Sequence, residues 1–323
     1  MEFVELNYPK LIDILKENAK LPRHLKETAK LVKIPLEDIE IPATENVEEL
    51  GLTSMLTQRV LYCKKIGDFD SAKKACKRNI EIYKRIPENT RNTKGLVGAY
   101  ATYATLVQDE NPEEAIYYYE LELKEIDSAK GKIEEVEKCV FIANAKADLG
   151  TLYRPLDLNK SIRLLKDSLT ERESLEGLVD ENDRMVQLAY TYEKLAYSLE
   201  TVDLRESINY RKMAIDSFEA VEGHMEETER LAYVIEDSAT VYNQSYKAGM
   251  ENELHLQKGL NAGRKLTKLG PMNRFQKHSI KTYEYLLHRA VRTYPENKEI
   301  KEEHRSVKRL ISELEGKLPY QAK

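Results

Sequence analysis

The sequence predicts an all-α fold, a superhelix of about six stacked helix hairpins. A repeating unit is the first observation: small or apolar residues recur at steps of 43, 46, 46, 47 and 46, at Ala72, Ala115, Ser161, Ser207, Leu254 and Ile300. A glycine stands sixteen positions after each of the last five. Self-similarity at such a period is typical of stacked helical repeats. With only 13 glycines in 323 residues and 33% charged residues, the composition also suits a helix-rich protein.

Each unit is predicted to hold two helices. Between Ser207 and Gly223 the apolar residues recur at helical spacing, and a glycine ends a helix easily because it adopts the left-handed conformation. A second helix pattern keeps four apolar columns at constant spacing in three units: Cys139, Ile142, Ala143 and Leu149; Met185, Leu188, Ala189 and Leu195; Leu231, Val234, Ile235 and Val241. A single hairpin cannot bury both of its apolar stripes, so neighbouring hairpins must stack.

The predicted repeat array spans residues 47–316. Its units lie at about 47–88, 89–131, 132–177, 178–223, 224–270 and 271–316, and a short tail, 317–323, follows. Residues 1–46 stand outside the repeat pattern. There, Pro9 in a first turn and the apolar Leu11, Ile12 and Leu15 predict a short helix. We expect this segment to be an N-terminal helical cap or a small accessory module, since solenoids need their exposed end covered.

Two stretches resemble the tetratricopeptide repeat superfamily. Residues 67–72, Gly-Asp-Phe-Asp-Ser-Ala, resemble its turn and second-helix start, and residues 149–153, Leu-Gly-Thr-Leu-Tyr, its small-residue helix crossing. The period of about 46 residues, against 34 in the standard repeat, is similar to that of the long-repeat, kinesin-light-chain-like branch. The resemblance implies a right-handed α-α superhelix. It also implies that the first helix of every hairpin lines a concave face that binds a protein or peptide segment.

The positions that match the inward-facing ones of this superfamily are candidate binding residues. They are Asn144, Thr151, Arg154, Tyr190, Glu193, Tyr197, Glu236, Asn243 and Tyr246. Tyr190 and Tyr197 fall off the core columns, whereas Tyr103 and Tyr192 fall on them and are expected to be buried. The second unit contributes small residues such as Gly98, which would leave the groove open there. A rigid, amphipathic tyrosine ring supplies contact area at low entropic cost.

A second interpretation is a peptide-sensing regulator. Residues 25–39 have the outline of a helix-turn-helix, and such a module before a tetratricopeptide array resembles the peptide-sensing transcription regulators of Gram-positive bacteria. The would-be recognition helix, residues 36–41, carries Glu37, Asp38 and Glu40, and Pro42 interrupts it. Three carboxylates would face phosphates, and no Lys or Arg is present to read guanine. The segment is therefore degenerate as a DNA reader, and we do not expect nucleic acid to be the partner.

No pattern of catalytic or metal-binding chemistry stands out. The glycine-containing stretch 259–265 lacks the spacing of a phosphate loop and lies inside a predicted helix. None of the six histidines pairs with another at i,i+4, and no serine stands in a nucleophile elbow. Carboxylate pairs on helices of this charge density are interpreted as surface groups. We therefore expect a protein that is not an enzyme and that holds neither a cofactor nor a metal.

The cysteine content and the charge distribution indicate the compartment of the protein and the kind of partner it could meet. Cys63, Cys76 and Cys139 are too few and too scattered for a disulfide framework, so buried free thiols in a reducing compartment are expected. No apolar run is long enough to cross a membrane, and the first residues lack the pattern of a signal peptide, so we expect a cytoplasmic protein. Residues 258–310 carry 14 Lys or Arg against 5 Glu, which is either a solvated surface or a basic end that meets an anionic partner.

Overall fold

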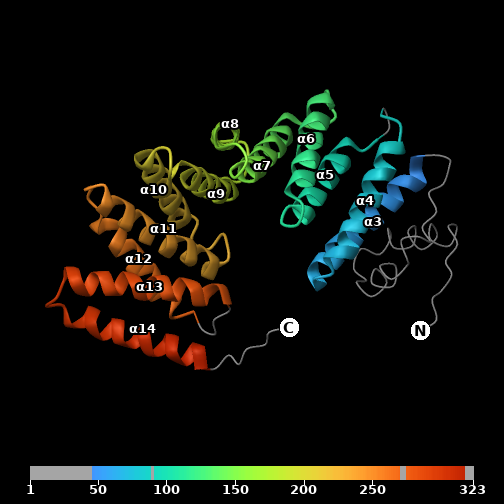
Figure 1. Ribbon diagram of the computed structural model, residues 1–323. Helices are drawn as coiled ribbons and strands as arrows, with labels where there is room; N and C mark the ends of the chain where they lie inside the picture. Colours follow the sequence, from blue (N-terminus) through green and yellow to red (C-terminus); the bar gives the residue numbers. More distant parts are fainter. Residues whose placement is uncertain (1–45, 89–90, 270–273, 317–323) are drawn as a thin grey trace. The chain divides into compact units, whose positions relative to one another are not determined.

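The computed structural model describes residues 46–88, 91–269 and 274–316, and over these ranges the secondary structure consists of helices and their turns (Figure 1). The first helices of the six hairpins are α3 (Asn46–Ile66), α5 (Thr93–Val107), α7 (Glu135–Tyr153), α9 (Glu181–Leu199), α11 (Glu227–Lys247) and α13 (Arg274–Thr293). The second helices are α4 (Phe69–Arg85), α6 (Pro112–Ser128), α8 (Leu158–Ser174), α10 (Leu204–Ala220), α12 (Glu253–Leu266) and α14 (Lys298–Gly316). The predicted all-α fold of consecutive hairpins is confirmed.

The helices fall into two compact units, Met1–Leu152 and Tyr153–Lys323. In the first unit α3, α4, α5 and α6 pack in succession, and Phe141 and Ile142 of α7 pack against a small core around Val97 and Ile126. In the second unit each helix from α8 to α14 packs against the next, and α11 also contacts α13. The predicted N-terminal cap, the helix-turn-helix interpretation, Gly270 and the tail 317–323 lie outside the described residues.

Aspartate or asparagine caps fix where most of the second helices begin. The side chain of Asp157 accepts a hydrogen bond from the Lys160 amide at 2.9 Å, and Asp203 accepts one from the Glu206 amide at the same distance. Asp68 and Asn111 cap α4 and α6 in the same way. Such caps satisfy backbone donors that the first helical turn leaves unpaired. At the other end, Gly177 and Gly223 have φ angles of 71° and 84°, which a side chain would disfavour.

One repeat anchor is misplaced in the sequence-based register. The residue four positions after the cap is fully buried in α4, α6, α8 and α10, where it is Ala72, Ala115, Ser161 or Ser207. In α12 the residue preceding the helix is Asn252, so the equivalent residue is Leu256, which is 1% exposed. Leu254, the predicted anchor, is 64% exposed. Helix α11 has 21 residues where α9 has 19, so the start of α12 comes later than a constant period allows, and its buried anchor is shifted by two residues.

Most residues of the predicted core columns are buried. Leu188, Ala189 and Leu195 are at most 4% exposed, and the four column residues of α11 are at most 1% exposed. Cys139, Ile142 and Met185 are half-buried. Tyr103 and Tyr192 are buried, as expected of tyrosines on core columns, and Cys63 and Cys76 are buried free thiols.

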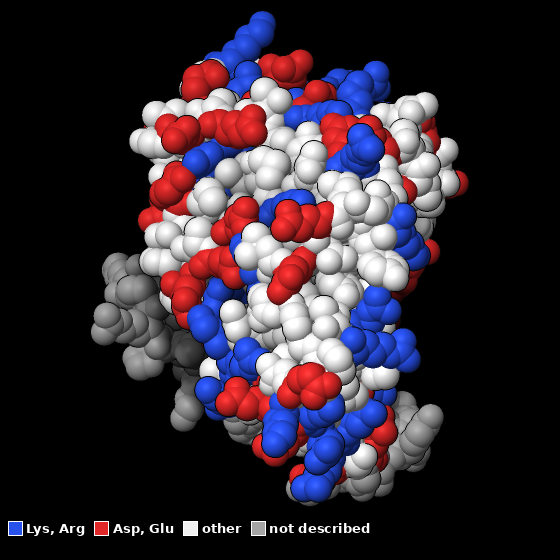
Figure 2. Space-filling view, turned by 90° about the vertical axis from the view of Figure 1, so that its left-hand side faces the viewer, with Lys and Arg blue, Asp and Glu red and all other residues white. Residues whose placement is uncertain are grey.

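Ion pairs join the second helices of neighbouring hairpins. They connect Lys166 to Glu206, Lys258 to Asp216, and Arg264 to Glu303, at 2.6–2.8 Å. Lys73 of α4 pairs in a similar way with Glu110, which lies in the turn before α6, at 2.7 Å. In the view of Figure 2 acidic and basic side chains alternate over most of the surface, and basic ones gather at the lower end, where α13 and α14 lie in Figure 1. Several basic residues of the 258–310 segment therefore already have acidic partners within the protein.

The helical glycines of α12 are required by close packing. Gly259 and Gly263 lie four residues apart, hence on one side of the helix, and face α13. An alanine Cβ at Gly263 would lie 2.2 Å from Cδ2 and 2.4 Å from Cγ of Tyr283. Because Tyr283 is 1% exposed, its ring has little room to move away. The stretch predicted to be helical rather than a phosphate loop is thus the interior of α12, and its glycines allow close approach of α13.

We expect Gly263→Ala to lower the free energy of unfolding by about 1–3 kcal/mol, the usual range for overpacking a core. The intrinsic helix preference of alanine offsets only about 0.5–1 kcal/mol of this loss. Hydrogen exchange of amides in α12 and α13 measures the local effect. Gly98→Ala in α5 is the matched control, because nothing lies within 4 Å of its added Cβ. This control should gain about 0.5–1 kcal/mol. Equal stabilisation by both substitutions would contradict the close approach at Gly263.

Candidate protein-binding surface

The first helices of the second unit, α9, α11 and α13, are joined to each other by side-chain hydrogen bonds. We call the surface that they form the first-helix face. Three bonds cross it: the Tyr190 hydroxyl donates to Glu229 at 2.9 Å, the Ser279 hydroxyl to Glu236 at 2.9 Å, and the Tyr285 hydroxyl to Asn243 at 2.6 Å. Each bond connects residues 39–43 positions apart, which is about one repeat. The bonds fix the spacing of these helices and therefore the shape of the face.

A groove of about 470 Å³ runs between α11 and α13 on this face. It is lined by Glu236, Ala239, Thr240 and Asn243 of α11 and by His278, Lys281, Thr282 and Tyr285 of α13. Two of the predicted residues, Glu236 and Asn243, are thus brought together here. The four α13 residues were not predicted, because extending the column of Asn243 by its step of 46 residues leads to Arg289 and not to Tyr285. The groove offers charges of both signs and several hydroxyl groups.

Tyr190 is more deeply packed than its place in the repeat suggested. Its ring meets Phe218 and Tyr233 edge-on, with centroids 5.5 and 5.3 Å away. Burial and the hydrogen bond to the Glu229 carboxylate raise the pKa of the Tyr190 hydroxyl well above its ordinary value. Part of this ring therefore belongs to the packing between hairpins, and its role in binding stays a prediction.

Arginines cover two exposed tyrosine rings of the second unit. The guanidinium carbon of Arg154 lies 3.6 Å from the ring centroid of Tyr197, which is 49% exposed. The guanidinium of Arg289 lies 5.1 Å from the ring of Tyr246, which is 65% exposed. Such cation–π contacts hold a ring in place at little cost while one of its faces stays open. Arg154, Tyr197 and Tyr246, all predicted from sequence, therefore present rigid aromatic surface.

A charged cluster lies beneath the face. Arg211 of α10 donates a 2.7 Å hydrogen bond to Asp237 and a second one to Glu200, and the Gln244 amide donates to the same Glu200 oxygen. Burial, only partly offset by Arg211, raises the pKa of Asp237 to about 6. Burial and the negative charge of Asp237 raise the pKa of Glu193 to about 7. The predicted residue Glu193 is thus a half-buried carboxyl that exchanges its proton near neutral pH.

The remaining two predicted residues belong to the first unit. Asn144 and Thr151 lie on α7; Asn144 is half-buried, and Thr151 is exposed with its hydroxyl donating to the Ala147 carbonyl of its own helix at 3.0 Å. Seven of the nine predicted residues therefore lie on the second unit.

Within the described ranges no three His, Cys, Asp or Glu side chains are grouped so that they could hold a metal ion. None of the described helices is long and apolar enough to span a membrane.

The fold is that of tetratricopeptide-like helical repeats, in which consecutive helix hairpins stack. The crystal structure of BtubC (BKLC) from P. vanneervenii aligns with 83% of this chain and 93% of that chain, with a TM-score of 0.55 and 17% identity. This likeness confirms the tetratricopeptide-like fold. The crystal structure of Ton1535 from Thermococcus onnurineus NA1 aligns with 94% of this chain and 98% of that chain, with a TM-score of 0.31 and 13% identity. No protein-family profile and no curated protein matches the sequence.

Proposed function

We propose that this chain is a non-enzymatic scaffold that binds a peptide or protein segment on the first-helix face of its second unit. The observation that carries the proposal is the groove between α11 and α13, which the exposed ring of Tyr285 lines beside Asn243. Partly exposed aromatic rings next to satisfied polar groups are the usual centres of binding energy in protein interfaces. The tetratricopeptide-like fold supports this assignment, because stacked hairpins offer long surfaces for extended partners.

The polar character of the groove favours a partner segment of mixed charge. Glu236 at one end and Lys281 farther along α13 would each meet an opposite charge, while Thr240 and Thr282 offer hydroxyl groups between them. Rim charges of this kind orient a partner and speed its association more than they add affinity. The two tyrosines Tyr246 and Tyr197 would supply apolar contact on either side.

The test uses a partner identified by affinity capture from the native cell, followed by isothermal titration with purified variants. Tyr246→Ala should weaken binding by about 1–2 kcal/mol, roughly 5- to 30-fold, as for an aromatic interface residue. Leu254→Ala is the matched control, because Leu254 is 64% exposed but lies on the second helix α12. Its affinity should stay within about twofold of the parent. Unchanged affinity of Tyr246→Ala, or equal losses in both variants, would place the binding site elsewhere.

A further inference from the structure

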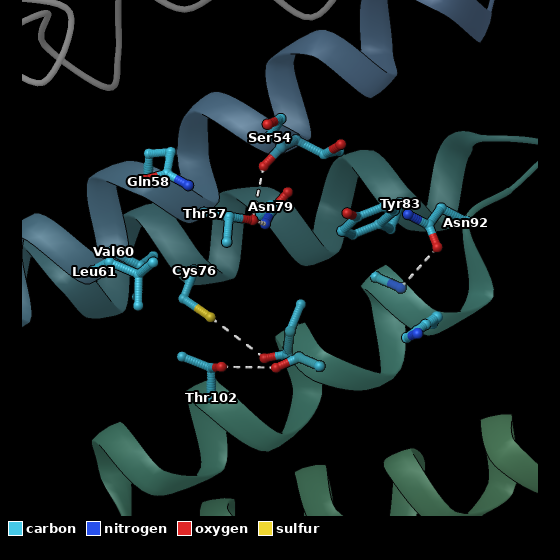
Figure 3. A pocket seen from close by; sticks show the side chains of 15 residues that line it. Ser54, Thr57, Gln58, Val60, Leu61, Cys76, Asn79, Tyr83, Asn92 and Thr102 are labelled. Atoms are coloured by element: carbon cyan, nitrogen blue, oxygen red, sulfur yellow. Dashed lines mark hydrogen bonds between the residues drawn. The ribbon is translucent and has the colours of Figure 1, made fainter. Parts of the chain in front are cut away.

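The first unit contains a separate pocket with its own chemistry. It lies between α3 and α5 with α4 as its floor, and its volume is about 510 Å³ (Figure 3). In Figure 3 Cys76, Asn79 and Tyr83 extend from α4 into the space between the other two helices. Because α3 and α5 are both first helices of their hairpins, the pocket belongs to the same kind of surface as the groove of the second unit.

This pocket is almost free of charge. Of the fifteen residues that line it only Lys94 is charged, whereas the 33% charged residues of the whole chain would lead us to expect about five. Lys94 is half exposed, and its ammonium group pairs with Glu137 of α7. By contrast, three of the eight residues in the groove between α11 and α13 can carry charge. A charged group seated in the pocket of the first unit would find on its walls only Lys94, whose charge is already paired with Glu137, so burying it there would be costly.

The walls of the pocket leave open space and offer a ligand few hydrogen-bond donors. The hydroxyl of Thr57 donates to the Thr53 carbonyl at 2.9 Å, and that of Thr102 to the Gly98 carbonyl at 2.7 Å. The Cys76 thiol is likewise committed, to the Ala99 carbonyl at 3.3 Å. These three groups therefore already donate their hydrogens to backbone carbonyl oxygens. At Gly98 the wall is open, because no atom lies within 4 Å of the place where a Cβ would stand.

The floor holds an acceptor without a partner. Asn79 is 3% exposed, and its Nδ2 donates to the Thr57 hydroxyl at 3.0 Å. Its Oδ1 has no hydrogen-bond partner among the described residues. A buried acceptor left unpaired costs about 1–3 kcal/mol. A ligand N–H donor that reaches Oδ1 while Nδ2 keeps its bond to Thr57 would remove this cost.

We propose that the pocket between α3 and α5 binds an uncharged amide side chain, Asn or Gln, on an extended peptide segment of a partner protein. The side-chain N–H donates to Oδ1 of Asn79, and the aliphatic part of the segment packs against Val60, Leu61 and the open wall at Gly98. The site lies in the first unit and selects against charge, so it is distinct from the face proposed for the second unit. Together the two sites would let one chain hold two chemically different segments.

The test is selection of short random peptides, displayed on phage, by the full-length protein, with affinities of the selected peptides measured by fluorescence polarisation. Pocket-binding peptides should share an Asn or Gln, and its replacement by Asp or Lys should weaken binding about tenfold or more. Gly98→Leu, which places a side chain in the pocket, should weaken the same peptides to a similar degree. Thr102→Leu fills the pocket from another position and serves if Gly98→Leu does not fold, as judged by circular dichroism and thermal unfolding.

Two control variants separate the alternatives. Lys74→Ala should leave affinity within about twofold, because Lys74 of α4 is exposed and does not line the pocket. Tyr246→Ala, which tests the face of the second unit, should not affect these peptides either, so each proposal can fail without the other. Selected peptides anchored by a charged residue, or the absence of any peptide that is sensitive to filling the pocket, would overturn the proposal.

Discussion

Glu122→Gln is expected to raise the free energy of unfolding by about 2–3 kcal/mol at pH 7, and by more at higher pH. Glu122 lies on α6 and is 1% exposed, and its Oε2 has no hydrogen-bond partner among the described residues. Burial, together with the nearby charge of Asp148, raises the pKa of Glu122 from 4.5 to about 9. Gln has nearly the same shape as the protonated side chain and carries no proton that could be lost.

The pH dependence of this gain follows from proton binding. At neutral pH the folded chain keeps Glu122 protonated, whereas the unfolded chain ionises this group above about pH 4.5. The folded state therefore binds more protons, and the parent loses stability as pH rises from about 4.5 to 9. The slope is about 1.4 kcal/mol per pH unit for one fully coupled group. Because the variant lacks this slope, its advantage should vanish near pH 4.5 and grow steadily above it.

Urea denaturation of parent and variant at pH 5, 7 and 8.5 measures the difference. Asp127→Asn is the matched control, since Asp127 lies on the same helix but its side chain is exposed. This control should change stability little at any of the three pH values. An advantage of Glu122→Gln that is independent of pH, or a loss, would show that Glu122 is ionised in the folded protein.

The fold could be predicted from the sequence because the signals for the ends of each helix agree with the repeat period. The caps at Asp157 and Asp203, the glycines that end α8 and α10, and the apolar columns all point to the same hairpins, and each acts through neighbours close in sequence. The misplaced anchor at Leu254 shows the limit of this reasoning. A constant period carries no information about the length of a single helix or turn, and the greater length of α11 becomes evident only in the structure, where Leu256 takes the buried position.

The candidate site was harder to predict because it depends on contacts between units of the repeat. The repeat position of Tyr190 does not reveal that its hydroxyl meets Glu229 and its ring meets Phe218. The interpretation of carboxylates as surface groups was wrong for Glu122 and Asp237, which are 1% and 3% exposed. For Glu122 a signal existed. It stands within the helical pattern of Tyr119 and Ile126, at a position where an apolar residue would be expected.

Arg211→Met is expected to lower the free energy of unfolding at pH 7.5 by about 3–5 kcal/mol, the usual cost of removing one member of a buried ion pair. The side chain of Arg211 is 8% exposed and that of Asp237 is 4% exposed, and their hydrogen bond joins α10 to α11. Without the guanidinium, Asp237 must either stay ionised in an apolar surrounding or take up a proton. Both alternatives cost free energy at this pH, because the unfolded chain keeps the carboxylate hydrated.

Two further variants test the cause of this loss. Lys166→Met removes an ion pair that also joins neighbouring hairpins but is largely exposed, so it should cost about 1 kcal/mol or less. Arg211→Met combined with Asp237→Leu removes both charges and should recover most of the stability, since apolar replacement of a whole buried pair is often neutral. The loss in Arg211→Met alone should also shrink as pH falls toward 4.5, because below about pH 6 Asp237 takes up a proton in the folded parent as well, and the parent then loses its ion pair with Arg211. Urea denaturation at both pH values measures all three variants. A double variant no more stable than Arg211→Met would mean that the arginine acts by packing rather than by neutralising Asp237.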